Sequence, residues 1–239
     1  ALSLGVGLWA VPTLAPPMLA VAAGVAVLNT VGALLLYRAF AVGTLAVVSP
    51  IAASGNAIAV GIALLTGEAA TPTRLAGIAL TTLGVLLAAT DLGTLRRGQI
   101  TAAGVGEALL AALCFGGGLW GVAPLVAATG PVWTTWGLRA VGITLLLLLA
   151  RPLRRSLAAP PPATWAWLVP IGLCDVGAYL AYNLGLAGAT VAVVAVLASL
   201  FSAVTVLLAL AVLRERLAAG QWLGVALILG GVALVSMPG

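Results

Sequence analysis

Residues 17–36, PMLAVAAGVAVLNTVGALLL, form a stretch without a single charged side chain. A helix needs about 20 mainly apolar residues to cross a hydrocarbon core about 30 Å thick. Comparable runs follow along the chain, separated by short segments that contain Pro, Gly or Arg. These runs do not alternate apolar and polar residues, as the strands of a membrane barrel do. The stretch and its successors therefore predict membrane-spanning helices.

The composition of the whole chain agrees with this prediction. Of the 239 residues, 63% are hydrophobic and only 6% are charged, and the mean hydropathy is +1.26. A soluble domain carries about 25% charged residues, because its surface faces water. We therefore predict an all-α integral membrane protein that forms one membrane domain. Its predicted spans are 1–14, 16–36, 44–66, 72–90, 101–123, 132–150, 163–182, 190–212 and 219–237.

The residue types present restrict the chemistry of the protein. The chain has no His and its ten basic residues are all Arg, so imidazole catalysis, a metal site and a phosphate-binding loop with its Lys are not expected. We predict neither an enzyme nor an ATP-driven pump, and no cofactor. The pI near 10.3 is attributed to Arg in loops on one side of a membrane, and not to nucleic-acid binding. Cys114 and Cys174 are interpreted as small apolar residues.

An internal duplication is visible in the sequence. Tyr37, Gly43 and Ser54 recur 145 positions later as Tyr182, Gly188 and Ser199. Further on, an offset of 147 relates three more pairs, Glu68 with Glu215, Gly77 with Gly224 and Gly84 with Gly231. The sequence thus predicts two repeats, residues 1–95 and 99–239.

The first repeat is incomplete. Residues 5–14 align with 116–125, and the offset then jumps from 111 to 145, so the helix around 132–150 has no counterpart after Leu14. Either the protein has lost this helix, or the sequence lacks a stretch that the natural protein contains. We favour the second explanation, because the loss of one helix would leave neighbouring apolar faces without a partner. A complete protein would then have five helices in each repeat and ten in all.

An odd number of helices in each repeat has a topological consequence. The second repeat has to enter the membrane from the opposite side, so the two five-helix repeats are inverted relative to one another. Secondary transporters share this architecture and bind their substrates near the midplane, where the repeats meet. We therefore expect a ten-helix bundle of two inverted repeats with a site at the repeat interface.

The second half also resembles a known family. From Tyr182 it contains YNLGLAGAT, then LASLFSAVT, LRERL and GQWLGVALILGGVAL, in that order. Together these segments resemble the EamA-type domain of the drug/metabolite transporter superfamily, and YRAFAVGT from Tyr37 belongs to a fainter copy. The resemblance implies a ten-helix exporter of amino acids or related metabolites with a central cavity. The absent helix of the first repeat is a departure from this pattern.

Asp175 is the most informative polar position. It lies near the middle of the span 163–182, and an ionisable side chain there is costly unless it faces a cavity or a partner. Tyr179 and Asn183 follow at four and eight residues and share its helical face. We predict that this face contacts substrate, with Asp175 binding an amine or coupling to protons. The alternative is a structural carboxylate that is paired with Arg139 or with a backbone amide.

Further candidates for substrate binding are distributed over both repeats. Arg139 begins the span 132–150 and either contacts a substrate carboxylate or anchors the helix end by snorkelling. Aromatic and amide side chains complete the set; Trp residues near helix ends also serve as interfacial anchors. These candidates are Trp120, Trp136, Asn29, Tyr37 and Asn56.

Other polar side chains have structural interpretations. Ser54 and Ser199 are interpreted as close-packing residues. Glu68 and Glu215 each precede the last helix of a repeat, where a carboxylate is expected to satisfy the free amides of that helix. Pro50 is expected to kink its helix.

The function expected from the sequence is secondary export of small polar metabolites, most directly amino acids, by alternating access in the cell (inner) membrane. A proton gradient is one candidate source of energy. Alternatives are transport of nucleotide-sugars, drugs or sugars, and a structural membrane subunit. Partners are a small-molecule substrate and membrane lipid, and a monomer suffices because the duplication supplies both halves of a path.

Overall fold

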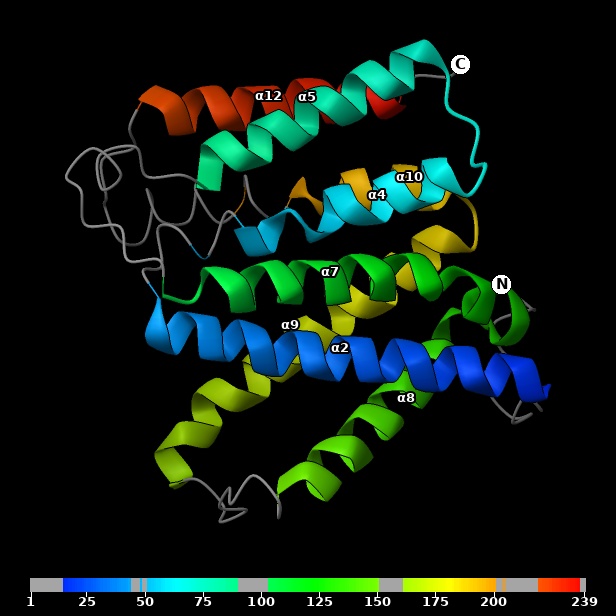
Figure 1. Ribbon diagram of the computed structural model, residues 1–239, viewed down its shortest axis with the longest axis vertical. Helices are drawn as coiled ribbons and strands as arrows, with labels where there is room; N and C mark the ends of the chain where they lie inside the picture. Colours follow the sequence, from blue (N-terminus) through cyan, green and yellow to red (C-terminus); the bar gives the residue numbers. More distant parts are fainter. Residues whose placement is uncertain are drawn as a thin grey trace. The chain divides into compact units, whose positions relative to one another are not determined.

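The computed structural model describes residues 15–43, 48, 51–89, 103–150, 161–200, 204 and 219–236, and these residues form eight α-helices (Figure 1). The helices are α2 (Pro16–Val42), α4 (Gly55–Leu65), α5 (Pro72–Ala89), α7 (Val105–Gly121), α8 (Ala123–Ala150), α9 (Pro162–Leu186), α10 (Val191–Ala198) and α12 (Ala219–Ser236). The predicted all-α class is confirmed. The predicted span 1–14, with the gap after Leu14, lies outside the described residues, as do Pro50 and Glu215.

Three of these helices are long and apolar enough to cross a membrane: α2, α8 and α9. Four shorter apolar helices cover residues 51–65, 72–87, 105–121 and 222–235. Apolar side chains also dominate their surfaces. On α9, for example, Ile171 is 63% exposed and Leu173 is 70% exposed. Side chains of this kind are stable on a helix surface that faces lipid.

The chain divides into two compact units. Unit 1 combines the chain up to Thr30 with Gly121–Ala189, and unit 2 combines Val31–Trp120 with Thr190–Gly239. Each unit thus contains segments from both of the repeats predicted from the sequence.

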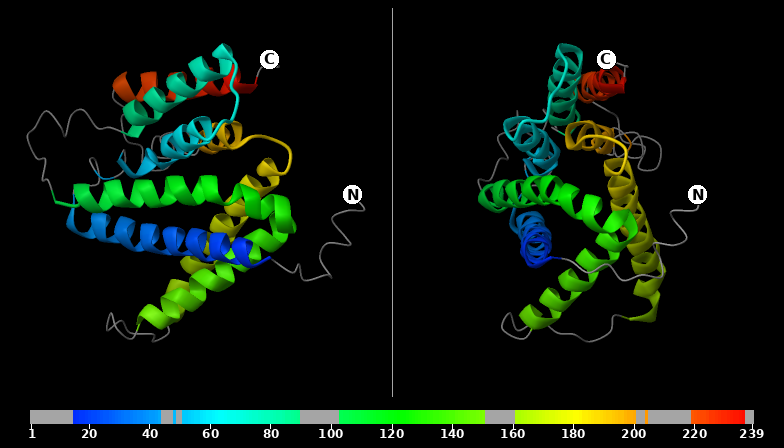
Figure 2. Two further views of the ribbon diagram at one scale, coloured as in Figure 1. Left: turned by 45° about the vertical axis from the view of Figure 1, so that its right-hand side comes forward. Right: turned by 90° about the vertical axis from the view of Figure 1, so that its right-hand side faces the viewer.

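In unit 2, α5 and α12 pack against each other (Figure 2). Their glycines occupy equivalent positions of the two predicted repeats. A Cβ added to Gly77 would lie 2.7 Å from the carbonyl oxygen of Gly231, and one added to Gly84 would lie 2.7 Å from that of Gly224. The pairing is reciprocal, because Gly224 corresponds to Gly77 and Gly231 to Gly84. Contacts that run in opposite order along the two helices make them antiparallel. Small residues permit such close approach of helices in lipid.

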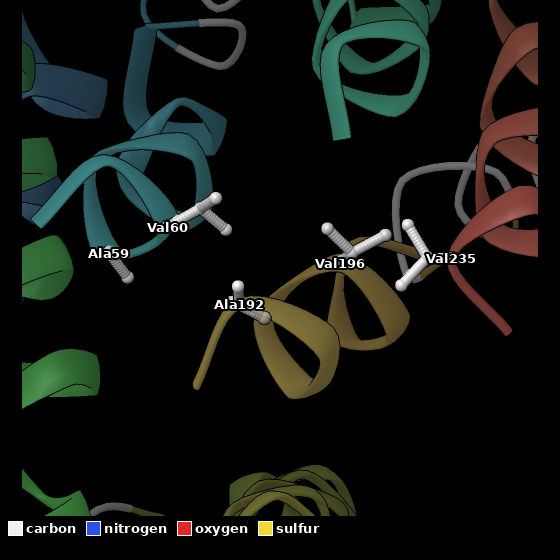
Figure 3. Close-up of a cluster of buried hydrophobic side chains, with 6 residues drawn as sticks. Ala59, Val60, Ala192, Val196 and Val235 are labelled. Atoms are coloured by element: carbon white, nitrogen blue, oxygen red, sulfur yellow. The ribbon is translucent and has the colours of Figure 1, made fainter. Parts of the chain in front are cut away.

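Helices α4 and α10 of unit 2 also come from corresponding parts of the two predicted repeats. They pack through small apolar side chains (Figure 3). Its core contains Ala59, Val60, Ala192, Ala195 and Val196, all at most 3% exposed. Val235 of α12 joins this cluster and connects α12 to the α4–α10 pair.

Helices α2 and α7 supply an ion pair to unit 2. The Nε atom of Arg38 lies 3.3 Å from the Oε1 atom of Glu107. The side chain of Arg38 is 72% exposed and that of Glu107 is 28% exposed, so this pair is a surface contact of modest strength.

Glu68 caps α10, a helix that the sequence did not connect with it. Its Oε1 atom accepts a hydrogen bond from the backbone N–H of Ala192, at 2.9 Å, in the first turn of α10. The prediction that Glu68 serves the helix that follows it in sequence is wrong. That helix, α5, begins with Pro72, which has no N–H, and Thr71 Oγ1 already accepts from the N–H of Arg74 at 3.4 Å. Glu68 follows α4, which packs against α10, and this packing brings the carboxylate to the start of α10.

Replacement of Glu68 by Ala is expected to lower the free energy of unfolding by about 1 kcal/mol, because it removes a cap and a negative charge from a helix N-terminus. Glu68→Gln keeps an acceptor oxygen and should lose less. Thermal unfolding of the purified protein measures both. Equal midpoints for Glu68→Ala and the unsubstituted protein would show that the cap contributes nothing.

In unit 1, α8 and α9 pack against each other. Helix α8 is interrupted at Gly130, whose φ of 78° and ψ of 162° are not helical, and Pro131 follows. Glycine adopts positive φ without a steric penalty, and proline cannot donate a helical hydrogen bond. The chain is helical on both sides of this kink. Residues 123–129, which lie between the predicted spans 101–123 and 132–150, are already helical.

Candidate functional site

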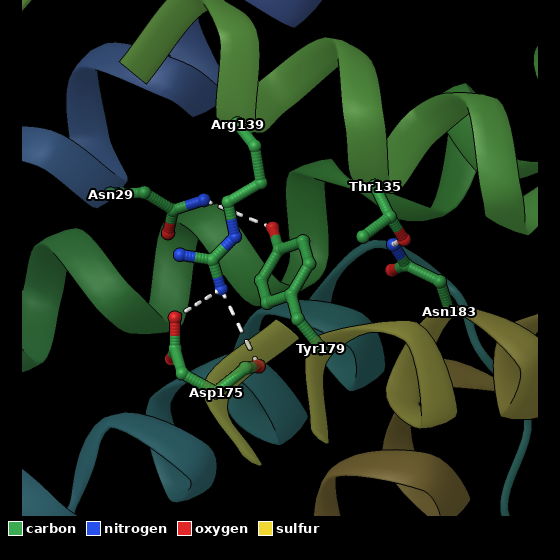
Figure 4. A network of polar contacts seen from close by, with 6 residues as sticks. All are labelled: Asn29, Thr135, Arg139, Asp175, Tyr179 and Asn183. Carbon is green, nitrogen blue, oxygen red and sulfur yellow. Dashed lines mark hydrogen bonds and ion pairs between the residues drawn. The ribbon is translucent and has the colours of Figure 1, made fainter. Parts of the chain in front are cut away.

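An ion pair joins the middles of the two long helices of unit 1. The Nη2 atom of Arg139, in α8, lies 2.6 Å from the Oδ2 atom of Asp175, in α9 (Figure 4). The same Nη2 atom also lies 3.5 Å from the backbone oxygen of Asp175. The side chain of Arg139 is 34% exposed and that of Asp175 is 60% exposed. The two opposite charges are thus paired with each other and are also accessible.

Tyr179 and Asn29 extend this pair into a polar cluster. The guanidinium carbon of Arg139 lies 5.2 Å from the centre of the Tyr179 ring, within the range of a cation–π contact. The Asn29 side-chain amide, in α2, donates a hydrogen bond of 3.0 Å to the Tyr179 hydroxyl. Figure 4 shows these side chains converging from three helices. We call Asn29, Arg139, Asp175 and Tyr179 the polar cluster.

Asn183 lies one turn further along α9 and is completely buried. Its Nδ2 atom donates to Thr135 Oγ1 at 2.8 Å, and that hydroxyl donates to the carbonyl oxygen of Pro131 at 2.7 Å. The Oδ1 atom of Asn183 has no hydrogen-bond partner among the described residues. A buried acceptor without a partner is costly, and Asn183 is 0% exposed.

The helical spacing predicted from the sequence is confirmed here, because Asp175, Tyr179 and Asn183 all turn toward residues of α8. The structure places Arg139 inside α8, opposite Asp175. The sequence placed it near the start of the span 132–150, whereas α8 begins at Ala123, and its guanidinium contacts Asp175. This contact is the structural partner that the sequence left open for Asp175.

The comparison with protein families decides the identity of the chain. The model of the EamA-like transporter family matches residues 102–237, more than half of the chain. The chain belongs to the EamA-like transporter family. It is therefore a multi-pass membrane transporter and not a member of an enzyme family.

The fold of this EamA-like transporter also has relatives among solved structures. One, described as the crystal structure of a protein, is 19% identical in sequence, with a TM-score of 0.72, and the match covers 94% of this chain and 79% of that chain. This likeness concerns the fold alone. The comparison with curated proteins gives no match.

Four other residues of this EamA-like transporter were predicted to bind substrate. Trp136, also in α8, is 62% exposed. Tyr37 is 70% exposed and Trp120 is 38% exposed, and both belong to unit 2. Asn56 lines a small cavity in unit 2. Within the described part of the chain, no group of three or more His, Cys, Asp or Glu side chains lies together to hold a metal ion.

The sequence did not single out Thr135, the partner of Asn183. Its signal was weak: Thr134 and Thr135 form a pair of hydroxyl residues shortly after Pro131, inside an apolar run. Hydroxyl side chains often bond to their own helix, and both threonines do so. Only the packing of α8 on α9 shows that Thr135 also accepts from Asn183.

Proposed function

We propose that this EamA-like transporter exports amino acids, or closely related small polar metabolites, across the cell (inner) membrane by alternating access. The observation that carries the proposal is the accessible Arg139–Asp175 ion pair in the middle of two long apolar helices. Charged groups inside a membrane domain are rare and mark substrate or ion pathways.

The polar cluster matches the charges of a zwitterion. Arg139 offers a planar set of donors that suits a carboxylate, and Asp175 offers an acceptor for an ammonium group. An amino acid carries both groups on one carbon, so it can replace the internal ion pair by two new ones. Arg139 and Asp175 each still have an oppositely charged partner, which limits the cost of opening the internal pair in a medium of low dielectric. Tyr179 and Asn29 add one aromatic face and one amide beside these charges.

Two further observations support a site at the interface of inverted repeats. Asn29 belongs to the predicted repeat 1–95, whereas the other members of the polar cluster belong to 99–239, so both repeats contribute. The reciprocal glycine contacts of α5 and α12 are those expected of antiparallel, symmetry-related helices. We therefore retain a ten-helix bundle of two inverted five-helix repeats as the architecture of the complete protein.

The proposed substrate contacts are the polar cluster and Asn183, with Trp136 beside them in α8. Trp120, Tyr37 and Asn56, in unit 2, are proposed contacts in other stages of the transport cycle. Energy comes from a solute or ion gradient, and a proton gradient acting through Asp175 is one candidate. A monomer suffices, because the repeats supply both halves of the path.

Export from preloaded cells tests the proposal with three matched solutes: an amino acid, the amine that lacks its carboxylate, and the acid that lacks its amino group. The amino acid should leave faster when the protein is present. For each analogue, the increase in export rate caused by the protein should be at least about tenfold smaller, because one charge-assisted contact is missing.

Equal export of the amine and the amino acid would contradict a role for Arg139 in carboxylate binding. If none of the three moves, the same cells are challenged with nucleotide-sugars, sugars and drugs, and transport of one of these would replace amino acids as the substrate. Absence of transport of every solute by the reconstituted protein would favour a structural subunit.

A further inference from the structure

The hydroxyl group of Tyr179 is oriented by a hydrogen bond from another helix. Its oxygen accepts a bond of 3.0 Å from the side-chain amide of Asn29, in α2. A phenolic hydroxyl has a proton of its own in addition to its lone pairs. Because the oxygen is the acceptor in this bond, the proton points away from Asn29 and remains to be donated to another group.

The position of Arg139 indicates which acceptor can reach this proton. The guanidinium carbon lies 5.2 Å from the centre of the Tyr179 ring, and the hydroxyl is at the edge of the same ring (Figure 4). A carboxylate has two oxygens, so one can accept from the guanidinium while the other accepts from the hydroxyl. The two donors are therefore placed to bind one carboxylate together.

The carboxylate of Asp175 does not occupy this position. Both contacts of Asp175 with Arg139 use the Nη2 atom, at 2.6 Å from Oδ2 and 3.5 Å from the backbone oxygen. The Nε and Nη1 atoms of Arg139 carry further N–H donors. Figure 4 joins the Asp175 side chain to Arg139 and not to the Tyr179 hydroxyl. Arg139 is 34% exposed, so the carboxylate of a solute can approach both donors.

The duplicated fold does not require the bond between Asn29 and Tyr179. At the offset of 145 that relates the two predicted repeats, Asn29 corresponds to Cys174 and Tyr179 corresponds to Leu34. A side chain that both repeats need for their shared fold is expected in both of them. This difference between the repeats favours a functional role for the two residues.

We propose that Tyr179 determines the specificity of the site for carboxylates, because its hydroxyl, oriented by Asn29, donates a hydrogen bond to the substrate carboxylate that Arg139 binds. This inference rests on the proposed export of amino acids. It assigns recognition of the carboxylate to Arg139 and Tyr179 together, and recognition of the ammonium group to Asp175 alone. A site built to hydrogen-bond one group of a substrate discriminates strongly against an analogue that lacks the group, since its polar atoms then stay unpaired.

The Tyr179→Phe variant tests the hydroxyl, because it keeps the aromatic ring beside Arg139 and the cation–π contact. The probes are the exported amino acid, the amine that lacks its carboxylate and the acid that lacks its amino group. If leucine is exported, the analogues are isopentylamine and isocaproate. The rise of the thermal unfolding midpoint with solute concentration measures binding to the purified protein. The half-saturating concentration should rise about tenfold for the amino acid and the acid, and stay within about twofold for the amine.

A purely structural role of Tyr179 predicts a different result. Binding of all three solutes would then weaken by the same factor, and this outcome would overturn the proposal, as would unchanged binding of all three. Tyr179→Phe also leaves the Asn29 amide without its acceptor. The Asn29→Leu/Tyr179→Phe variant removes both partners of that bond, and it should show the same selective loss for the solutes that carry a carboxylate.

The other tyrosine of α9 provides a matched control. Tyr182 is 7% exposed and corresponds to Tyr37 of the first repeat, so both repeats share it. Tyr182→Phe should keep the preference of the unsubstituted protein for the amino acid over the amine. If the unsubstituted protein neither binds nor exports any amino acid, the proposed function fails. If it does both and Tyr179→Phe keeps the same preference, only the role of Tyr179 fails.

Discussion

The Arg139→Gln/Asp175→Asn double variant is expected to reach the membrane at nearly normal levels and to export its amino acid about 100-fold more slowly. Both charges are removed together, so neither is left without its partner in a low-dielectric environment. The two ionic contacts proposed for the substrate are lost, and hydrogen bonds to charged groups contribute about 1.5–3 kcal/mol each. Initial rates of export, divided by the amount of protein in the membrane, measure the effect.

The single variants distinguish a structural pair from a functional one. Arg139→Gln and Asp175→Asn each leave one charge unpaired, and we expect a loss of folded protein from that cost. If the pair is only structural, the double variant should restore both folding and export. Recovery of export in the double variant would therefore contradict the proposed role of the polar cluster.

A second ion pair of the chain provides the control. Arg38→Gln/Glu107→Gln removes the 3.3 Å pair of α2 and α7, which belongs to unit 2. Export should stay within about twofold of the unsubstituted protein, because exposed pairs contribute little to stability. A large loss here would mean that export is sensitive to ion pairs in general.

Replacement of Gly84 by Ala should have the largest effect on stability. The added Cβ would lie 2.7 Å from both the Gly224 carbonyl oxygen and the Ile228 backbone nitrogen. Backbone atoms cannot move aside as a flexible side chain can, so α5 and α12 must separate. Overpacking of this kind costs about 1–3 kcal/mol, and the midpoint of thermal unfolding should fall accordingly.

Two matched variants make this test specific. Gly61→Ala, in α4, adds a Cβ with nothing within 4 Å, and the higher helix propensity of Ala should keep or raise the stability. Gly231→Ala, at the position that corresponds to Gly84, would meet the Gly77 carbonyl oxygen at 2.6 Å. It should destabilise as much as Gly84→Ala does. A normal midpoint for Gly84→Ala would show that α5 and α12 do not pack as closely as described.

The sequence by itself determined the helical membrane class, the family and one face of the candidate site. Apolar runs of membrane-spanning length predict helices, because a backbone in lipid has to satisfy its own hydrogen bonds. The helical period of 3.6 residues placed Asp175, Tyr179 and Asn183 on one face. Both are local properties, which depend on composition and spacing along a single segment.

Only the tertiary structure decided which residues these faces contact. These contacts depend on the packing of helices that are distant in sequence. Arg139 pairs with Asp175, Asn29 donates to Tyr179, and Thr135 accepts from Asn183. The same holds for Glu68, which caps α10 and not the helix that follows it. Helix packing arises from many small contacts of similar apolar side chains. No single residue type encodes that arrangement, so the charged and polar partners could not be assigned before the helices were in place.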